Sequence, residues 1–166
     1  MIRILIGVLT YSLIFCGYVF RGHANQNKID HPGSDVTPLQ AWDMVQKDQE
    51  HTFLVDVRSK PEYMFSGHPL NAHNVPSKFW TGRLNGDKYV MQDNLNFEKD
   101  LLARFNPETD CLIILCSSGH RSARIMESVI YAGGDAETIS NVRGGFEGEW
   151  IKTEDRICKG RCRQGG

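Results

Sequence analysis

The sequence predicts an α/β fold with a central parallel sheet of about five strands and helices on both faces. Short runs rich in β-branched residues alternate with segments whose apolar residues recur at helical spacing, and this alternation is typical of parallel strands joined by helices. The chain has 166 residues, 40% hydrophobic and 23% charged. That length suits one well-buried core and leaves too little chain for two domains of ordinary size.

A capping pattern marks the first helix of the domain. Thr37 is followed by Pro38 and then by Gln40, an order typical of a helix N-terminus. Apolar residues at helical spacing come next, so we expect a helix here. The following segments predict a strand, a short helix that ends at Gly67, and a second strand, at residues 52–57, 61–66 and 73–75.

The second half of the domain continues the alternation. Residues 97–105 carry apolar side chains at helical spacing, and Asn106 and Pro107 end that predicted helix. The remaining elements are a β-branched-rich strand, a helix with one apolar face and a last strand, at residues 112–115, 122–130 and 138–142.

Both ends of the chain differ from this domain. Arg3 precedes an apolar run at residues 4–20, and Gly22-His23-Ala24 resembles a cleavage site, so the start is predicted to be a secretory signal peptide. An uncleaved membrane anchor is the alternative, because the run is long for a signal core. We therefore expect a periplasmic or secreted protein, or one anchored in the membrane and facing outside the cytoplasm. The predicted units are the signal or anchor, a flexible leader, the folded domain and a basic cysteine-containing tail, at residues 1–24, 25–35, 36–151 and 152–166.

Cys116 is the strongest candidate for chemistry. It follows the predicted strand at residues 112–115 and precedes the helix that starts near Ser122. A thiol at such a turn faces backbone N–H groups and the positive end of a helix dipole, and Arg121 adds a full charge. These surroundings favour the nucleophilic thiolate. The alternative is an ordinary buried core cysteine, and the nearby Gly119 and Arg121 argue against it.

The length of the loop after Cys116 indicates what it binds. Four residues separate Cys116 from Arg121, whereas cysteine loops of the tyrosine-phosphatase type have five, which leaves room for a tetrahedral oxyanion. A shorter loop suits one extra sulfur atom on the cysteine. The segment resembles the active loop of single-domain rhodaneses, a sulfurtransferase family, with Cys116 at the position of the persulfide-forming cysteine. The loop residues that follow it are Ser117, Ser118, Gly119, His120, Arg121 and Ser122.

Two further segments carry the same resemblance. Residues 56–63, followed by Gly67-His68 and residues 72–76, resemble the family's upstream signature, and residues 141–150 resemble its downstream one. Together the three segments cover roughly residues 36–151. The chain departs from the family at Pro69 and in a longer segment at residues 77–100. In that segment, Trp80, Arg83 and Tyr89 either wall the pocket or belong to a surface hairpin around Asn85-Gly86.

The resemblance implies a sulfurtransferase, and we expect neither a cofactor nor a metal. A thiolate on Cys116 takes a sulfur from a small anionic donor such as thiosulfate and passes it to cyanide, a thiol or a protein cysteine. The formal net charge of −1 gives no basic field for nucleic acid. Membrane contact is expected only if the N-terminal segment stays attached. The alternatives are a non-enzymatic exported module that carries or binds sulfur and a cysteine-based phosphatase or arsenate reductase, which the short loop argues against.

Asp56 and Arg58 are expected to support the active loop. Asp56 ends a predicted strand, at the edge where α/β sites gather, and the family resemblance implies a supporting role for this position. Arg58 and Glu62 are four residues apart and are predicted to form an ion pair with each other. His120, inside the loop, either helps to attract an anionic donor or simply faces solvent.

The other cysteines are assigned by their spacing. Cys111 begins the strand that leads to Cys116, so their Cα atoms are about 16 Å apart, too far for a disulfide. Cys111 is therefore predicted to be a core residue. Cys158 and Cys162 lie in the basic tail and would share one face of a helix. They are a redox pair that resolves Cys116, or else a structural staple or part of a frayed tail, and no further ligands accompany them for a metal.

Overall fold

The computed structural model describes residues 30–106, 108–148, 150–152 and 157–159 of the 166-residue chain. The predicted signal peptide or anchor at residues 1–24, the first part of the predicted leader and Cys162 lie outside the described residues. Within the described part, no helix combines the length and the apolar content needed to cross a membrane.

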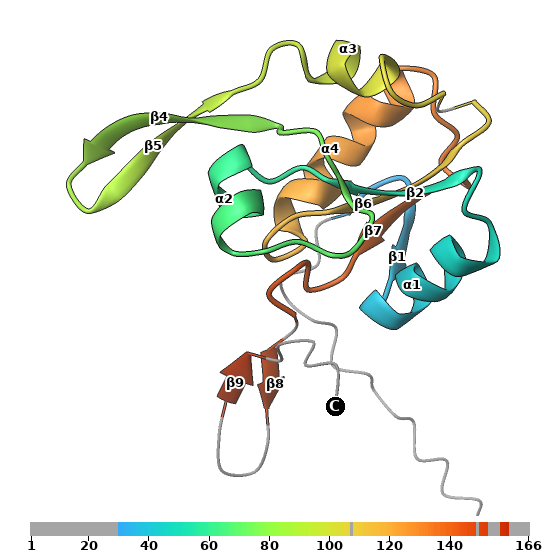
Figure 1. The fold of residues 1–166 in the computed structure, drawn as a ribbon, viewed down its shortest axis with the longest axis horizontal. Coiled ribbons are helices and arrows are strands. Elements are labelled where there is room, and N and C mark those ends of the chain that lie inside the picture. Colours follow the sequence, from blue (N-terminus) through green and yellow to red (C-terminus); the bar gives the residue numbers. More distant parts are fainter. Residues whose placement is uncertain (1–29, 107, 149, 153–156, 160–166) are drawn as a thin grey trace, which may run out of the picture.

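A five-stranded sheet of parallel strands forms the centre of the domain (Figure 1). Its strand order is β1-β7-β6-β2-β3, so the first and last of these strands in the sequence are neighbours at one edge. Their bounds are Ser34–Val36 for β1, Ile139–Val142 for β7, Cys111–Leu115 for β6, Thr52–Asp56 for β2 and His73–Asn74 for β3. The predicted α/β fold with a parallel sheet of about five strands is confirmed.

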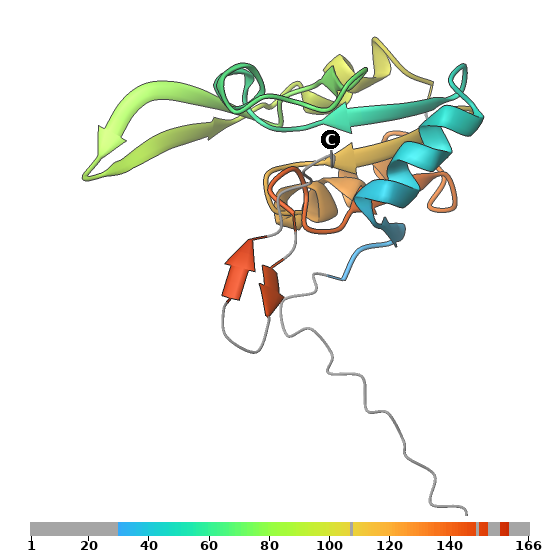
Figure 2. The same cartoon turned by 60° about the horizontal axis from the view of Figure 1, so that its bottom comes forward.

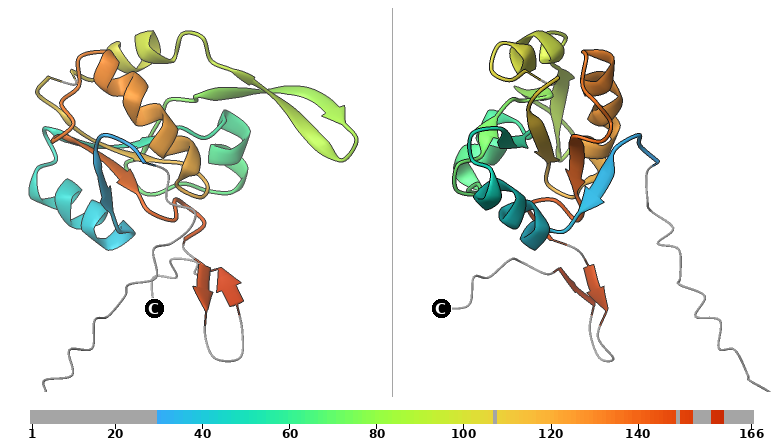
Figure 3. Two further views of the ribbon diagram at one scale, coloured as in Figure 1. Left: turned by 180° about the vertical axis from the view of Figure 1, so that it is seen from behind. Right: turned by 90° about the vertical axis from the view of Figure 1, so that its right-hand side faces the viewer.

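Helices lie on both faces of the sheet, as the right-hand view of Figure 3 shows for α1 and α4. Successive β6 side chains point to opposite faces. Ile114 belongs to the core cluster that contains Met126 of α4, whereas Ile113 belongs to the cluster with Ala41 of α1. The helix α1 spans Pro38–Lys47 and α4 spans His120–Tyr131. A third helix, α3 (Phe97–Leu102), packs on the same face of the sheet as α4.

Capping boxes fix the starts of two helices. Thr37 caps α1, because its Oγ1 accepts the Gln40 N–H at 3.2 Å while the Gln40 side chain accepts the Thr37 N–H at 2.8 Å. Ser59 and Glu62 repeat this arrangement at α2 (Lys60–Phe65). Since α2 directly follows the carboxyl end of β2 (Figure 2), its cap brings Glu62 to the edge of the sheet where β6 also ends.

Two differences from the predicted boundaries bear on the packing, and most other ends shift by only one or two residues. β1 begins at Ser34, inside the segment predicted as a leader, because Ser34 pairs with Ser140 of β7. α3 ends at Leu102, three residues earlier than its apolar spacing predicts. Phe105 then turns into the core, where its ring contacts those of Phe53 and His73.

The segment at residues 77–100 contains a long antiparallel hairpin of β4 (Lys78–Asn85) and β5 (Lys88–Asp93). It projects from the body of the domain in Figures 1 and 3. Trp80 and Tyr89 pack against each other across the hairpin, with ring centroids 4.4 Å apart. Of the two alternatives for this segment, the surface hairpin is therefore the one that forms. A second hairpin pairs β8 (Trp150–Lys152) with β9 (Ile157–Lys159).

Candidate active site

Cys116 lies directly after β6, where the chain turns into α4. The side chain is buried, with 1% of the residue exposed. Its Sγ accepts a hydrogen bond from the Gly119 backbone N–H at 3.2 Å, and the Ser122 Oγ lies 3.4 Å away. Gly119 adopts a φ of +88° as the residue before α4, a conformation that favours glycine. The loop therefore folds back so that the start of a helix faces the sulfur.

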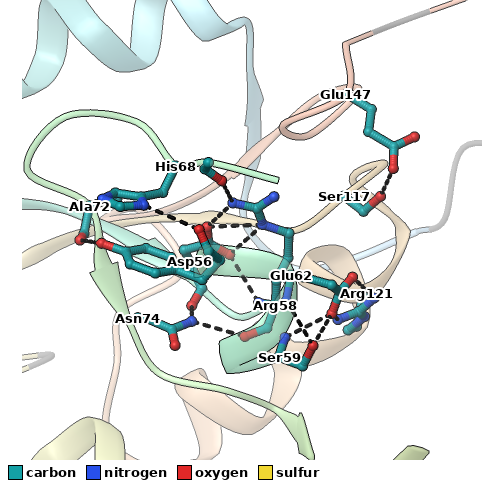
Figure 4. A network of polar contacts seen from close by, with 12 residues as sticks. Asp56, Arg58, Ser59, Glu62, His68, Ala72, Asn74, Ser117, Arg121 and Glu147 are labelled. Atoms are coloured by element: carbon teal, nitrogen blue, oxygen red, sulfur yellow. Dashed lines mark hydrogen bonds and ion pairs between the residues drawn. The ribbon is translucent and has the colours of Figure 1, made fainter. Parts of the chain in front are cut away.

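The segment after β7 holds this loop from the other side. The Phe146 N–H donates to the Cys116 carbonyl at 2.8 Å, and the Glu147 N–H donates to the Ser117 carbonyl at 2.9 Å. The Ser117 hydroxyl also bonds the Glu147 carboxylate (Figure 4). A Cβ on Gly145 would lie 2.3 Å from the Cys116 carbonyl oxygen, so only glycine allows the two segments to approach this closely.

Arg121 is bonded to Glu62, as Figure 4 shows. Two parallel hydrogen bonds of 3.1 Å join its guanidinium to the carboxylate. Burial tends to raise the pKa of Glu62, but the hydrogen bonds from Arg121 and Ser59 outweigh it, so this pKa lies below its ordinary value. Burial likewise tends to lower the pKa of Arg121, but Glu62, with smaller contributions from Cys116 and Asp56, raises it by more. Both groups are therefore charged at neutral pH, and α2 is tied to the active loop.

The predicted ion pair between Arg58 and Glu62 is wrong. Arg58 instead bonds Asp56, with its Nε 3.0 Å from both carboxylate oxygens and its terminal nitrogen 2.6 Å from one of them. The side chain also donates to the Gly67 carbonyl at 2.8 Å. Helix spacing favoured the residue four positions on, but Arg58 precedes α2 and turns inward, where the buried Asp56 needs a partner.

The buried pair of Asp56 and Arg58 reaches the active loop through one aromatic ring. The Arg58 guanidinium carbon lies 4.0 Å from the centroid of Phe146. The backbone of the same Phe146 bonds the Cys116 carbonyl. The upstream and downstream segments that flank the loop are therefore in contact with each other beside Cys116.

The histidines near the site do not form a cluster. His120 is exposed, with its Nδ1 3.3 Å from the Ser118 hydroxyl. His68 stacks on Tyr63 at 3.8 Å, and His73 packs edge-on against Phe53. Among the residues that the structure describes, no group of three or more His, Cys, Asp or Glu side chains could hold a metal ion.

A chain of polar side chains behind the loop, which the sequence did not predict, contacts Cys116 through Ser122. The Ser122 hydroxyl donates to the Asn141 side-chain oxygen at 2.7 Å, and the Asn141 amide donates to Asp35 at 2.8 Å. Asp35 in turn lies 3.0 Å from the His31 ring. Asn141 lies in β7 and Asp35 in β1. The strand β1 was not predicted from the sequence. Its pairing with β7 places Asp35 beside Asn141, so Asp35 could not be assigned to the site without it.

The remaining cysteines lie apart from the active loop or outside the described side chains. Cys111 starts β6, at the end of the strand opposite to Cys116, and burial raises the pKa of its thiol. The backbone of Cys158 lies in β9, paired with Ile151 of β8, and Cys162 is beyond the described residues. The backbone is thus extended at Cys158. The prediction that Cys158 and Cys162 share one face of a helix would have required a helix at this position.

Comparisons with known proteins agree on one family. Residues 37–152 match the model described as a Rhodanese-like domain. A thiosulfate sulfurtransferase GlpE from Haemophilus influenzae strain PittEE is 28% identical over 120 residues, which are 72% of this chain and 90% of the relative. The protein of the same name from strain Rd is 28% identical over 123 residues, 74% and 92% of the two chains. The crystal structure of Rv0390 from M. tuberculosis matches with a TM-score of 0.57 and 30% identity, covering 77% of this chain and 89% of that one.

Proposed function

The chain belongs to the rhodanese-like domain family, and we propose that it transfers sulfane sulfur through a persulfide on Cys116. The placement of the thiol carries this proposal. Cys116 is buried at the end of β6, and its Sγ accepts the Gly119 N–H at 3.2 Å where α4 begins. Backbone N–H groups at a helix start stabilise negative charge, both on the attacking thiolate and on the outer sulfur of a persulfide.

The first half-reaction uses thiosulfate as the model donor. The Cys116 thiolate attacks the outer sulfur, the bond between the two thiosulfate sulfurs breaks, and sulfite leaves with that electron pair. Cys116 then carries a terminal sulfur with one negative charge. In the second half-reaction an acceptor such as cyanide, a small thiol or a protein cysteine attacks that sulfur. The bond to Sγ breaks, and the Cys116 thiolate is restored.

The positive charge of Arg121 beside the loop supports the proposal that the sulfur donor is a small anion. Arg121 keeps its charge while bonded to Glu62, because the pKa of its guanidinium is raised by that carboxylate. We propose that Arg121 chiefly holds the loop in shape and adds an attractive field, since both of its terminal nitrogens already contact Glu62. His120 is exposed at the start of α4 and is the second group that can face an arriving anion.

Mass spectrometry of the purified protein tests this function. After incubation with thiosulfate, the intact protein should gain about 32 Da, the mass of one sulfur atom, and cyanide should remove it. Cys116→Ser should not gain this mass. Cys111→Ser is the matched control, since Cys111 lies at the other end of the same strand, and it should load sulfur normally. Sulfur loading by Cys116→Ser would refute the proposal.

We propose further that the domain is exported, on the basis of the apolar run and the cleavage pattern at residues 1–24. N-terminal sequencing of protein from the exported fraction should begin near Asn25. An intact Met1 on protein in the membrane fraction would favour the anchor, and an intact Met1 on protein in the cytoplasmic fraction would refute export.

A further inference from the structure

The Ser122 hydroxyl faces three acceptors with one proton. Its Oγ lies 2.7 Å from the Asn141 Oδ1, 3.1 Å from the Gly119 carbonyl and 3.4 Å from the Cys116 Sγ. A serine hydroxyl can donate only one hydrogen bond at a time. The choice of acceptor decides whether Ser122 stabilises a negative charge on the sulfur.

Asp35 settles which end of the Asn141 amide faces Ser122. The Asn141 nitrogen lies 2.8 Å from the Asp35 Oδ1. A carboxylate only accepts hydrogen bonds, so the amide must turn its NH₂ group toward Asp35 and its oxygen toward Ser122. Both Ser122 and Asn141 are buried. The amide oxygen would therefore lose a hydrogen bond, without water to replace it, if Ser122 turned its proton elsewhere.

We propose that Asn141, oriented by Asp35, is a positioning residue that holds the Ser122 proton away from the Cys116 sulfur. The thiolate then receives the Gly119 N–H but must compete with Asn141 for the Ser122 proton. This competition withholds a hydrogen bond from negative charge on the sulfur, and it slows reaction of the resting Cys116 with oxidants and other electrophiles.

The charged groups around the Ser122–Asn141–Asp35 hydrogen-bond chain are the same in Asn141→Leu, Ser122→Ala and Ser34→Ala, and only Asp35→Ala removes one of them. Arg121, Glu62, His120 and Glu147 lie on or beside the active loop, and Asp56 interacts electrostatically with Arg121. His31 faces Asp35 on its other side, at 3.0 Å. A change in Cys116 reactivity after substitution of Asn141 therefore reports the hydrogen-bond chain.

The inference rests on the proposed function, because it concerns the nucleophile of that reaction. Alkylation by iodoacetamide tests it without any sulfur donor, so it can succeed or fail independently of sulfur transfer. The rate at Cys116 is followed across pH by mass spectrometry of the peptide that contains it. In Asn141→Leu the Ser122 proton no longer bonds Asn141, so it is shared only between Sγ and the Gly119 carbonyl. The rate in the acidic part of the profile should rise about three- to tenfold, the scale expected for one hydrogen bond gained by the sulfur.

Two further variants make the result specific. Asp35→Ala lets the Asn141 amide turn its NH₂ group toward Ser122, so the rate should rise in the same direction. Asp35 is partly exposed in an edge strand, so this variant also serves if Asn141→Leu does not fold, as judged by circular dichroism. In a Ser122→Ala background, Asn141→Leu should no longer accelerate alkylation.

The control is Ser34→Ala, which removes a hydrogen bond of 2.8 Å to Ser140 in the same pair of strands but outside the chain to Cys116. Its alkylation profile should match that of the unsubstituted protein. An unchanged or slower rate in a folded Asn141→Leu or Asp35→Ala protein would overturn the inference. So would acceleration that persists without the Ser122 hydroxyl.

Discussion

The backbone N–H of Phe146 donates a 2.8 Å hydrogen bond to the carbonyl of Cys116. The ring of Phe146 lies against the buried Arg58, whose guanidinium carbon is 4.0 Å from the ring centroid. Phe146, in the segment after β7, thus supports the nucleophile through its backbone. Its side chain supports the buried ion pair of Arg58 and Asp56. The shape of the active loop therefore depends on segments that are distant in sequence.

Lengthening the loop should disable it. Insertion of one glycine between Ser118 and Gly119 moves the Gly119 N–H away from the Cys116 Sγ, which it now contacts at 3.2 Å. Thiosulfate-dependent sulfur transfer should fall by orders of magnitude, while the protein stays folded. The matched control is a glycine inserted after Gly86 in the turn of the β4–β5 hairpin, which should leave the rate unchanged. Normal turnover with the lengthened loop would show that compactness does not select sulfur.

Gly145→Ala should lower the free energy of unfolding. The added Cβ would lie 2.3 Å from the Cys116 carbonyl oxygen and 2.7 Å from the Ser117 carbonyl carbon. Gly86→Ala separates this contact from backbone strain, because Gly86 has nearly the same φ, +60° against +58°, and open space around it. We expect Gly86→Ala to lower the free energy of unfolding by about 1 kcal/mol and Gly145→Ala by at least about 3 kcal/mol. Urea denaturation measures both, and equal losses would contradict the predicted contact.

The bond between Glu62 and Arg121 should make stability depend on pH in the acid range. The pKa of Glu62 is lowered on folding from its ordinary value of 4.5. Its contribution is therefore fully present above pH 4.5 and is lost as the pH falls through the lower folded-state pKa. The difference in unfolding free energy between the unsubstituted protein and Glu62→Gln should be below about 1 kcal/mol at neutral pH, since both side chains are partly exposed. It should shrink in acid.

Glu137→Gln controls for the change in net charge, because Glu137 is an exposed residue before β7. Denaturant titrations at several pH values compare the three proteins. A difference between Glu62→Gln and the unsubstituted protein that grows in acid would have the wrong sign for this ion pair.

The cysteine-containing tail should be dispensable for sulfur loading. β8 and β9 form a two-stranded sheet of their own, outside the five-stranded sheet that carries Cys116. A chain truncated after Lys152 should load sulfur from thiosulfate at a rate within about tenfold of the full chain, equivalent to 1.4 kcal/mol of barrier. If the truncated protein loads sulfur but no longer releases it to a thiol acceptor, Cys158 and Cys162 act as a resolving pair. A paired Cys158→Ser and Cys162→Ser variant of the full chain then distinguishes the thiols from the tail itself.

The sequence predicted the parallel sheet and the position of Cys116 because both depend on local patterns. The β-branched run at residues 112–115 and the helix after it are defined by neighbouring residues, and the capping box of Thr37 is complete within four positions. Such features need no knowledge of the rest of the chain. The loop composition similarly placed the thiol at a helix start, where the structure has it.

The contacts that support the loop were harder to predict because they join distant segments. Arg121 bonds Glu62, which is 59 residues away, and Asn141 bonds Asp35 across 106 residues. Helix spacing favoured Glu62 as the partner of Arg58, whereas tertiary packing gave it to Arg121. β1 has only three residues and no alternation to detect, so Asp35 could be recognised as part of the site only through strand pairing.

The pairing of β1 with β7 also constrains the order in which the protein folds. Among the strands that the structure describes, β1 is the first to leave the ribosome, yet its partner is made more than a hundred residues later, since Ser34 lies opposite Ser140. The edge of the sheet can close only after nearly the whole domain has been synthesised, and such long-range closure is slow. The hydrogen bonds that join Ser122, Asn141 and Asp35 behind Cys116 are consequently formed among the last in the molecule. A nascent or locally opened polypeptide would therefore expose the Cys116 thiol before these hydrogen bonds are in place.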